Sequence, residues 1–364
     1  MSPPSPVLRL QAGGRGLGSA SPANVTTIRE SIQLIVLLVV GTVVVAASPM
    51  RAAAADEEHR QPTVMVVAVP VADVRATPQA ADGTTAHDDA QETQLLYGER
   101  VSVLEHTGPW ARIEAQEQAE FTHHARWEGY PGWVEWKVLR PIGPATGSTL
   151  AVQRKWADIR EAPHEIAPVV ITVALGTWLV GLDHQDRWWQ VHLMDGGTGW
   201  LRDDDALPLD ALGALSVSTK RQRLIEAARH FLGDPYRWGG RSPHDPELRD
   251  PPTGVDCSGL VQLAYRTIGA SLPRDAHEQY VRSRRISREH LQPGDAVFLS
   301  KAHHPQEIVH VLLYAGAGRL IEGPGTGLRV REINWTERFG VPFLRTDAGL
   351  VVNDQTIWFG AYLP

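Results

Sequence analysis

Short apolar runs separated by polar turns follow one another from about residue 62, and this pattern occurs twice. The first pass has its strand-like runs and turns at 72–78, 96–99, 108–113 and 129–134. The second pass repeats these landmarks in the same order at 157–163, 174–176, 186–191 and 197–201. Short strands with glycine and tryptophan at recurring places are typical of small β-barrels. The pattern therefore predicts two barrels, at 62–142 and 149–208.

The first of these two copies is longer than the second. Its additional residues are mostly polar and fall at 79–91 and 115–128. Polar segments between strands are expected to form surface loops, which often carry binding residues. We therefore expect loops of the first barrel to reach over a neighbouring site. Tyr130 follows closely on the second insertion.

Beyond these repeats the apolar pattern changes to that of helices and then of buried strands. A helix capped by Ser218 is predicted at 219–232, and a loop that becomes a second amphipathic helix at 255–267. Strands are predicted at 296–299, 310–315 and 319–322. We expect an α+β domain at 218–364, joined to the barrels by a linker at 208–217.

The composition is that of an ordinary globular protein. Of 364 residues, 43% are hydrophobic and 21% are charged, which is enough for two or three domains with their own cores. The formal net charge is −7, and no stretch concentrates Lys and Arg. A nucleic-acid partner is therefore not expected.

The N-terminal segment at 1–55 resembles a disordered leader followed by an export signal. Residues 1–30 are rich in Gly, Ser, Pro and Ala, and 31–50 carry no charge. The apolar centre at 34–47 has the length of a signal-peptide core, and Ala53-Ala54-Ala55 offers a cleavage site. The alternative is an uncleaved membrane anchor. Both alternatives predict that the domains are exported.

Cys257 is the only cysteine of the chain, and it stands where the helix at 255–267 should begin. A helix N-terminus favours anions, so it lowers the pKa of a thiol and increases the fraction of reactive thiolate. The alternative is that Cys257 is a small buried apolar residue without reactivity. The sequence around it, Asp256-Cys257-Ser258-Gly259-Leu260, leaves both interpretations open.

A histidine and a carboxylate are expected to lie near this cysteine. The strands at 310–315 and 319–322 are joined by a Gly-Ala-Gly turn, so they should pair as an antiparallel hairpin. His310 and Glu322 would then lie side by side on one face. A thiolate, an imidazole and a polar group that orients the imidazole are the components of a cysteine peptidase site.

Five sequence blocks, in this order, resemble the NlpC/P60 family of cell-wall cysteine peptidases. They fall at 233–240, 256–260, 272–275, 291–295 and 310–314. The resemblance implies a papain-like NlpC/P60 catalytic domain, and the two barrels resemble bacterial SH3-like domains. It implies Cys257 as nucleophile and His310 as base. The third catalytic position is usually histidine in this family, and here it falls on Glu322.

The resemblance also implies an activity and a set of substrate-binding residues. The family's bond is that between γ-D-glutamate and a diamino acid, diaminopimelate or lysine, in peptidoglycan stem peptides, and no metal or organic cofactor is needed. Tyr236 matches an active-site tyrosine of relatives, and Tyr130 matches a barrel tyrosine that closes the cleft near a free L-Ala amino group. Asp256 and Ser258 are expected to bind that ammonium group or to cap the helix. Glu92 and Glu99 are weaker candidates for the same role.

Several alternatives remain at this stage. If the barrels form a lid, the enzyme should act on released muropeptides, whereas glycan-binding barrels would direct it to the intact wall. A muramoyl-L-alanine amidase, an acyltransferase or a non-catalytic wall-binding protein would use the same fold. A metal site at His303, His304 and His310 or at His123 and His124 is not expected, because no carboxylate or cysteine was found at ligand spacing.

Overall fold

The computed structural model describes residues 62–81, 87–248 and 250–364. The expectations for residues 1–55 lie outside this range. In the described part, no helix has the length and apolar character that crossing a membrane requires.

The first seven strands form one antiparallel sheet with the order β3-β2-β6-β5-β4-β1-β7. They are β1 (Thr63–Val67), β2 (Val71–Arg75), β3 (Gln91–Leu96), β4 (Arg100–Thr107), β5 (Trp110–Glu120), β6 (Glu128–Glu135) and β7 (Leu139–Pro141), with the short helix η1 (Trp136–Val138) before β7. Alternate residues of these strands, among them Val74, Ile113 and Val134, meet in a common core. We call this sheet barrel 1.

The next seven strands repeat this arrangement. They are β8 (Ser148–Val152), β9 (Trp156–Arg160), β10 (Val169–Ala174), β11 (Trp178–Gln185), β12 (Trp188–His192), β13 (Thr198–Arg202) and β14 (Ala206–Pro208). Their order, β10-β9-β13-β12-β11-β8-β14, is that of barrel 1 in every position. Two sheets of identical topology are what the repeated sequence pattern predicts. We call the second sheet barrel 2.

The second insertion of barrel 1 differs from the expected loop. Strand β5 extends to Glu120 and pairs with β6 beyond a register shift between Ala115 and Ala119. Only the turn between Glu120 and Glu128 lacks strand structure. The backbone groups of the polar residues are therefore satisfied by pairing, so the insertion forms an extended hairpin rather than a loop.

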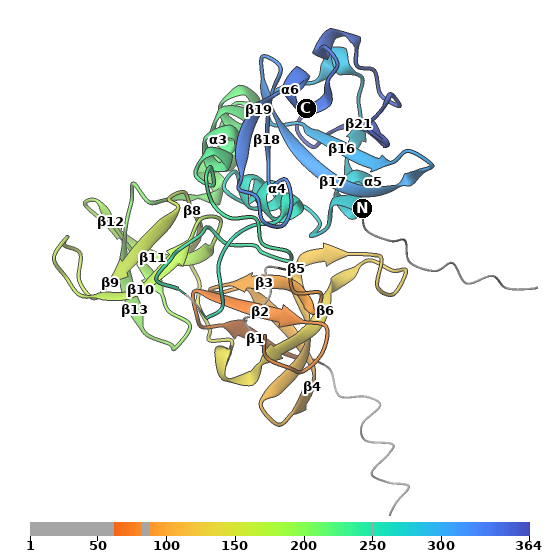
Figure 1. Cartoon of the computed structure of the whole chain (residues 1–364). Coiled ribbons are helices and arrows are strands. Elements are labelled where there is room, and N and C mark those ends of the chain that lie inside the picture. The colour runs from red at the N-terminus through yellow and green to blue at the C-terminus, as the bar shows by residue number, and fades with distance from the viewer. Residues whose placement is uncertain (1–61, 82–86, 249) are drawn as a thin grey trace, which may run out of the picture. The chain divides into compact units, whose positions relative to one another are not determined.

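The C-terminal part combines helices with a third sheet of order β15-β21-β16-β17-β18-β19. Its strands are β15 (Arg284–Arg285), β16 (Ala296–Lys301), β17 (His304–Gly316), β18 (Arg319–Glu322), β19 (Arg331–Asn334), β20 (Val351–Val352), which pairs with β21, and β21 (Gln355–Ala361). The helices are α2 (Leu209–Ala214), α3 (Val217–Arg229), α4 (Cys257–Arg266), α5 (Ala276–Arg282), η2 (Arg288–His290), α6 (Trp335–Phe339) and η3 (Phe343–Arg345). Helices α3 and α4 lie together beside this sheet (Figure 1).

Two details differ from the sequence-based expectation. The segment expected as a linker contains helix α2, whose Leu212 is fully buried. Helix α3 begins two residues earlier than predicted, because the Ser216 hydroxyl, not that of Ser218, accepts the N–H of Thr219. Both serines offer a capping oxygen, so the sequence alone does not distinguish them.

The core of the C-terminal part includes residues of both barrels. Val71 and Leu96 of barrel 1 and Leu175 of barrel 2 belong to the same buried cluster as Phe231 and Leu260. A buried ion pair adds to this contact, because Arg241 donates to Glu99 of barrel 1 at 2.7 Å. Barrel 1 therefore packs directly against the segment that leads to Cys257.

Candidate active site

Helix α4 begins at Cys257, and Asp256 caps it. The Asp256 side chain accepts the N–H of Gly259 at 2.6 Å, and its backbone carbonyl accepts that of Leu260. Arg274, which is fully buried, donates to both carboxylate oxygens of Asp256 at 2.7 and 3.2 Å. These contacts leave the N–H groups of Cys257 and Ser258 at the helix start as donors for a developing oxyanion.

His310 lies on β17 and faces the carboxylate of Glu322 on β18. The distance from His310 Nε2 to Glu322 Oε2 is 3.2 Å. Because Nε2 faces Glu322, the other ring nitrogen, Nδ1, is the one that remains for Cys257. The structure thus brings together the three residues expected from the sequence.

The protonation of His310 reflects this position. Burial lowers the pKa of His310, but the charge of Cys257, a hydrogen bond to its sulfur and the hydrogen bond and charge of Glu322 raise the pKa to about 9. An imidazolium next to a thiolate is the reactive form of a cysteine peptidase. The raised pKa keeps His310 in the imidazolium form at neutral pH.

Glu322 is fully buried and is held as a carboxylate. Burial raises its pKa, but the hydrogen bond from His310 and the charges of Arg338 and His310 lower the pKa to about 2. Arg331 donates to Oε1 at 2.7 and 3.0 Å, and Arg338 donates to Oε2 at 3.0 Å. The carboxylate thus accepts hydrogen bonds from three cationic side chains.

Tyr236 keeps its proton close to the nucleophile. Burial and the negative charges of Cys257 and Asp256 raise the pKa of Tyr236. Its hydroxyl is therefore a hydrogen-bond donor at every pH at which the protein functions. The residue lines the same cavity as Cys257.

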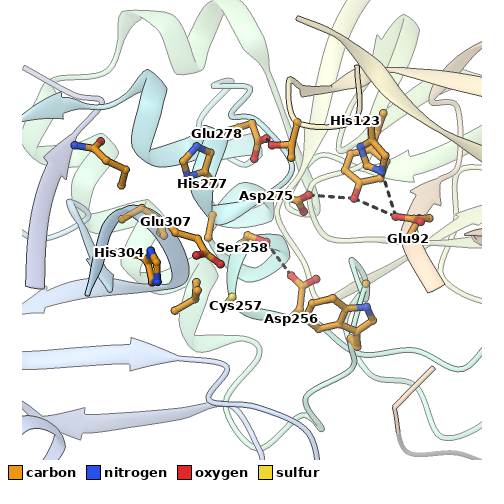
Figure 2. Close-up of a pocket in the computed structure, with 18 of the residues that line it drawn as sticks. Glu92, His123, Asp256, Cys257, Ser258, Asp275, His277, Glu278, His304 and Glu307 are labelled. Carbon is orange, nitrogen blue, oxygen red and sulfur yellow. Dashed lines mark hydrogen bonds and ion pairs between the residues drawn. The ribbon is translucent and has the colours of Figure 1, made fainter. Parts of the chain in front are cut away.

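A cavity of about 960 Å³ lies over Cys257 and is lined by both barrel 1 and the C-terminal part. Figure 2 shows Cys257 and Ser258 near its centre, Glu92 and His123 of barrel 1 on one side, and His304 and Glu307 on the other. A peptide bound with its carbonyl at Cys257 would therefore extend toward barrel 1 in one direction and toward the β16–β17 hairpin in the other.

The barrel 1 side of the cavity is acidic. The Tyr130 hydroxyl lies 3.0 Å from Asp275 Oδ2 and 3.4 Å from Glu92 Oε2. Burial and the neighbouring carboxylates Asp256 and Glu278 raise the pKa of Asp275 to about 6, although Arg274 and Tyr130 lower it. Partly exposed carboxylates grouped in this way can bind a cation such as an ammonium group.

The other candidate residues occupy distinct places. Asp256 and Ser258 line the cavity, but both accept hydrogen bonds from the buried Arg274, so their geometry is that of support for the helix start. Glu99 is buried in ion pairs with Arg241 and Arg266 and does not line the cavity. The sequence analysis assigned no role to Asp275, although this residue belongs to the block at 272–275 that resembles the NlpC/P60 family.

Three histidines of the two adjacent pairs line the cavity, and His124 does not. His303 and His304 line it on the hairpin side, and His123 lines it from barrel 1. His124 groups with Glu120 and Glu128, whose possible ligand atoms all lie within 4.8 Å of one another. The sequence-based expectation that no carboxylate lies at metal-ligand spacing from these histidines is therefore wrong for His124. Glu128 is already paired with Arg126 at 2.5 Å and with His124.

Comparisons with known proteins identify relatives of this chain. The model of the NlpC/P60 family matches residues 233–341. A gamma-D-glutamyl-L-lysine dipeptidyl-peptidase from Bacillus cereus is 28% identical over 236 residues, which are 64% of this chain and 67% of that protein. The protein of the same name from Bacillus subtilis is 27% identical over 251 residues, 69% of this chain and 78% of the relative.

A solved structure extends the likeness to the fold. The crystal structure of an NlpC/P60 family protein from Bacillus cereus superimposes with a TM-score of 0.66 at 24% sequence identity. The match covers 83% of this chain and 100% of that chain. It therefore includes barrels as well as the domain that carries Cys257.

Proposed function

We propose that this chain is a cysteine peptidase that cleaves peptidoglycan stem peptides. Its residues 233–341 match the model of the NlpC/P60 family, and its relatives support a hydrolase of this kind. The substrate is a stem peptide with a free N-terminal L-Ala. The bond cleaved joins the γ-carboxyl of D-glutamate to a diamino acid, diaminopimelate or lysine. The observation that carries the proposal is the acidic group of Tyr130, Asp275 and Glu92 at one end of the cavity.

The reaction begins with Cys257 and His310. With the thiol proton already on His310, the Cys257 thiolate attacks the γ-carbonyl carbon. The N–H groups of Cys257 and Ser258 hold the oxyanion at the start of α4. Collapse of this intermediate breaks the C–N bond, His310 gives its proton to the leaving amine, and a thioester remains on Cys257. Water, deprotonated by His310, then hydrolyses the thioester.

Glu322 and Tyr236 support these steps. Glu322 accepts a hydrogen bond from the Nε2–H of His310, fixes the ring orientation and stabilises the imidazolium. The Tyr236 hydroxyl, which keeps its proton, is available to donate a hydrogen bond to the substrate in the cavity. Asp256, Ser258 and Arg274 hold the first turn of α4, so the nucleophile keeps its orientation.

The length of the acyl part follows from the barrel 1 side of the cavity. Asp275 and Glu92 line this side and can accept the positive charge of a substrate, although Arg274 and His123 lie beside them. A dipeptide with a free α-amino group supplies this charge close to the cleaved bond. An N-acetylated or muramoyl-linked peptide lacks the charge and adds bulk.

The experiment is digestion of L-Ala-γ-D-Glu-diaminopimelate, with and without an N-acetyl group, followed by mass spectrometry. The proposal predicts release of L-Ala-γ-D-Glu only from the free-amine peptide, and only with Cys257 intact. Cys257→Ala is the matched inactive control. The lysine-containing peptide, tested in parallel, identifies the diamino acid.

The other outcomes distinguish the remaining functions. Equal cleavage of both peptides would remove the requirement for the amino group and favour action on the intact wall. Release of an intact stem peptide from muramoyl substrates would identify an amidase. Binding to sacculi without any cleavage would identify a wall-binding protein.

We further propose that the enzyme is exported, because residues 31–50 have the composition of a signal peptide or anchor. Fractionation of cells that express the full chain tests this point, and N-terminal sequencing of the exported form distinguishes cleavage after residue 55 from an uncleaved anchor. Recovery in the cytoplasm alone would contradict the proposal.

A further inference from the structure

Glu322 receives more positive charge than an imidazole-orienting carboxylate requires. Arg331 is its cross-strand partner on β19, and Arg338 reaches it from α6. Within the described ranges, each of these two arginines has Glu322 as its one salt-bridge partner. Two guanidinium groups from different elements therefore converge on a carboxylate that also holds His310.

This geometry has two physical consequences. First, the hydrogen bonds from Arg331 to Oε1 and from Arg338 to Oε2 fix both oxygens of a buried carboxylate. Second, the positive charge of each guanidinium offsets part of the negative charge of Glu322, so Glu322 stabilises the His310 imidazolium less. The two arginines thus orient Glu322 and reduce the electrostatic stabilisation that its charge gives to the His310 imidazolium.

We propose that Arg331 and Arg338 are positioning residues that hold Glu322 against His310 and limit how strongly its charge stabilises the imidazolium. This inference rests on the proposed function, because it concerns the same Cys257, His310 and Glu322. The role of the two arginines explains how the carboxylate of Glu322 can occupy the third catalytic position, which is usually histidine in the NlpC/P60 family. Without the arginines, the negative charge of Glu322 would stabilise the imidazolium more strongly, so His310 would release its Nδ1 proton to the leaving amine less readily.

The charged groups around His310 come from several elements. Cys257 faces it from α4 and Glu322 from β18, with Arg331 and Arg338 behind Glu322. On the neighbouring strand β16, its pairing partner is the apolar Leu299. Helix α5 also packs against β17 and carries His277, Glu278 and Arg282, but none of these is a main cause of the pKa of His310.

The test measures the rate at which iodoacetate alkylates Cys257, as a function of pH. Cys257 is the single cysteine, so all alkylation reports on this site. The anionic reagent favours the imidazolium form of the ion pair, so the rate falls as His310 loses its proton. No peptide is needed, so failure of the proposed substrate does not affect this readout.

Opposite shifts are expected for the two kinds of variant. Glu322→Gln removes a negative charge from His310, so the midpoint of the fall should move down by about one pH unit. Arg331→Gln and Arg338→Gln remove positive charges, so the midpoint should move up by about half a unit, and further in the double variant. With the cleaved peptide, kcat of the arginine variants should fall about tenfold while KM stays the same.

Two controls separate this effect from loss of structure. Arg319→Gln changes an arginine of β18 with nearly the exposure of Arg331, and it pairs with Glu332 instead, so it should leave the midpoint unchanged. Arg338→Lys keeps the charge and should restore most of the wild-type midpoint. The proposal is overturned if the arginine variants do not shift the midpoint, or shift it in the same direction as Glu322→Gln.

Discussion

The Tyr130 hydroxyl, from a strand of barrel 1, lies 3.0 Å from the carboxylate of Asp275 at the start of α5. The two residues are far apart in the sequence, and they meet because barrel 1 packs against the segment that carries the nucleophile. Both residues line the cavity over Cys257 on its barrel 1 side.

Tyr130→Phe removes the hydroxyl and keeps the ring. We expect KM for the free-amine peptide to rise up to about tenfold, the value of one hydrogen bond, with little change in kcat. The preference for the free-amine over the N-acetylated peptide should fall by the same factor. Tyr97→Phe is the matched control, because Tyr97 is a buried tyrosine of barrel 1 whose hydroxyl accepts the N–H of Met194 instead. Equal effects of both variants would contradict a substrate-binding role for Tyr130.

The pKa of Asp275, raised to about 6, predicts a pH-dependent affinity. Above this pH the carboxylate is ionised and attracts the substrate ammonium, and below it the neutral acid does not. The α-amino group of the peptide remains protonated throughout this range. KM should therefore rise as the pH falls through about 6. In Asp275→Asn, KM should be high and independent of pH between 5 and 7, and a persisting pH dependence would assign it to another group.

Glu322 should contribute stability that acid removes. Its pKa is lowered to about 2 in the folded protein, so its contribution is present above the unfolded pKa and is lost as the pH falls through the folded value. The free energy of unfolding should therefore fall by about 2 to 4 kcal/mol from this group between pH 5 and pH 2. Denaturant unfolding at several pH values checks this prediction. Glu322→Gln should have a correspondingly smaller slope, and an unchanged slope would refute it.

The ion pairs of Glu99 should hold barrel 1 in place. Arg241 donates to both of its oxygens at 2.7 and 3.0 Å, and both side chains are buried. Glu99→Gln leaves Arg241 without its charged partner, so we expect a loss of about 3 to 5 kcal/mol in the free energy of unfolding. Glu105→Gln, which removes a solvent-exposed pair with Arg112, should reduce the free energy of unfolding far less, because solvent screens that pair. Equal losses of unfolding free energy in the two variants would show that burial does not increase the contribution of the Glu99 pair to stability.

Much of the candidate site could be predicted because its determinants are local. The helix start at Cys257 follows from a capping aspartate and an apolar period, and the hairpin that pairs His310 with Glu322 follows from two short strands and a glycine turn. The duplicated barrels follow from repeated landmarks, since equal sequences of strands and turns give equal strand orders.

The remaining features depend on contacts between distant segments. Asp275 meets Tyr130, Arg274 meets Asp256, and Arg338 meets Glu322 only after the sheets and helices have packed. Nothing in the sequence around Asp275 or Arg338 distinguishes a side chain that faces the cavity or a buried carboxylate from one that faces solvent. Periodicity and capping are properties of neighbouring residues, so the sequence by itself determined the elements and the nucleophile. The partners of a buried charge depend on which surfaces meet, so only the tertiary structure decided the acidic end of the cavity and the arginines behind Glu322.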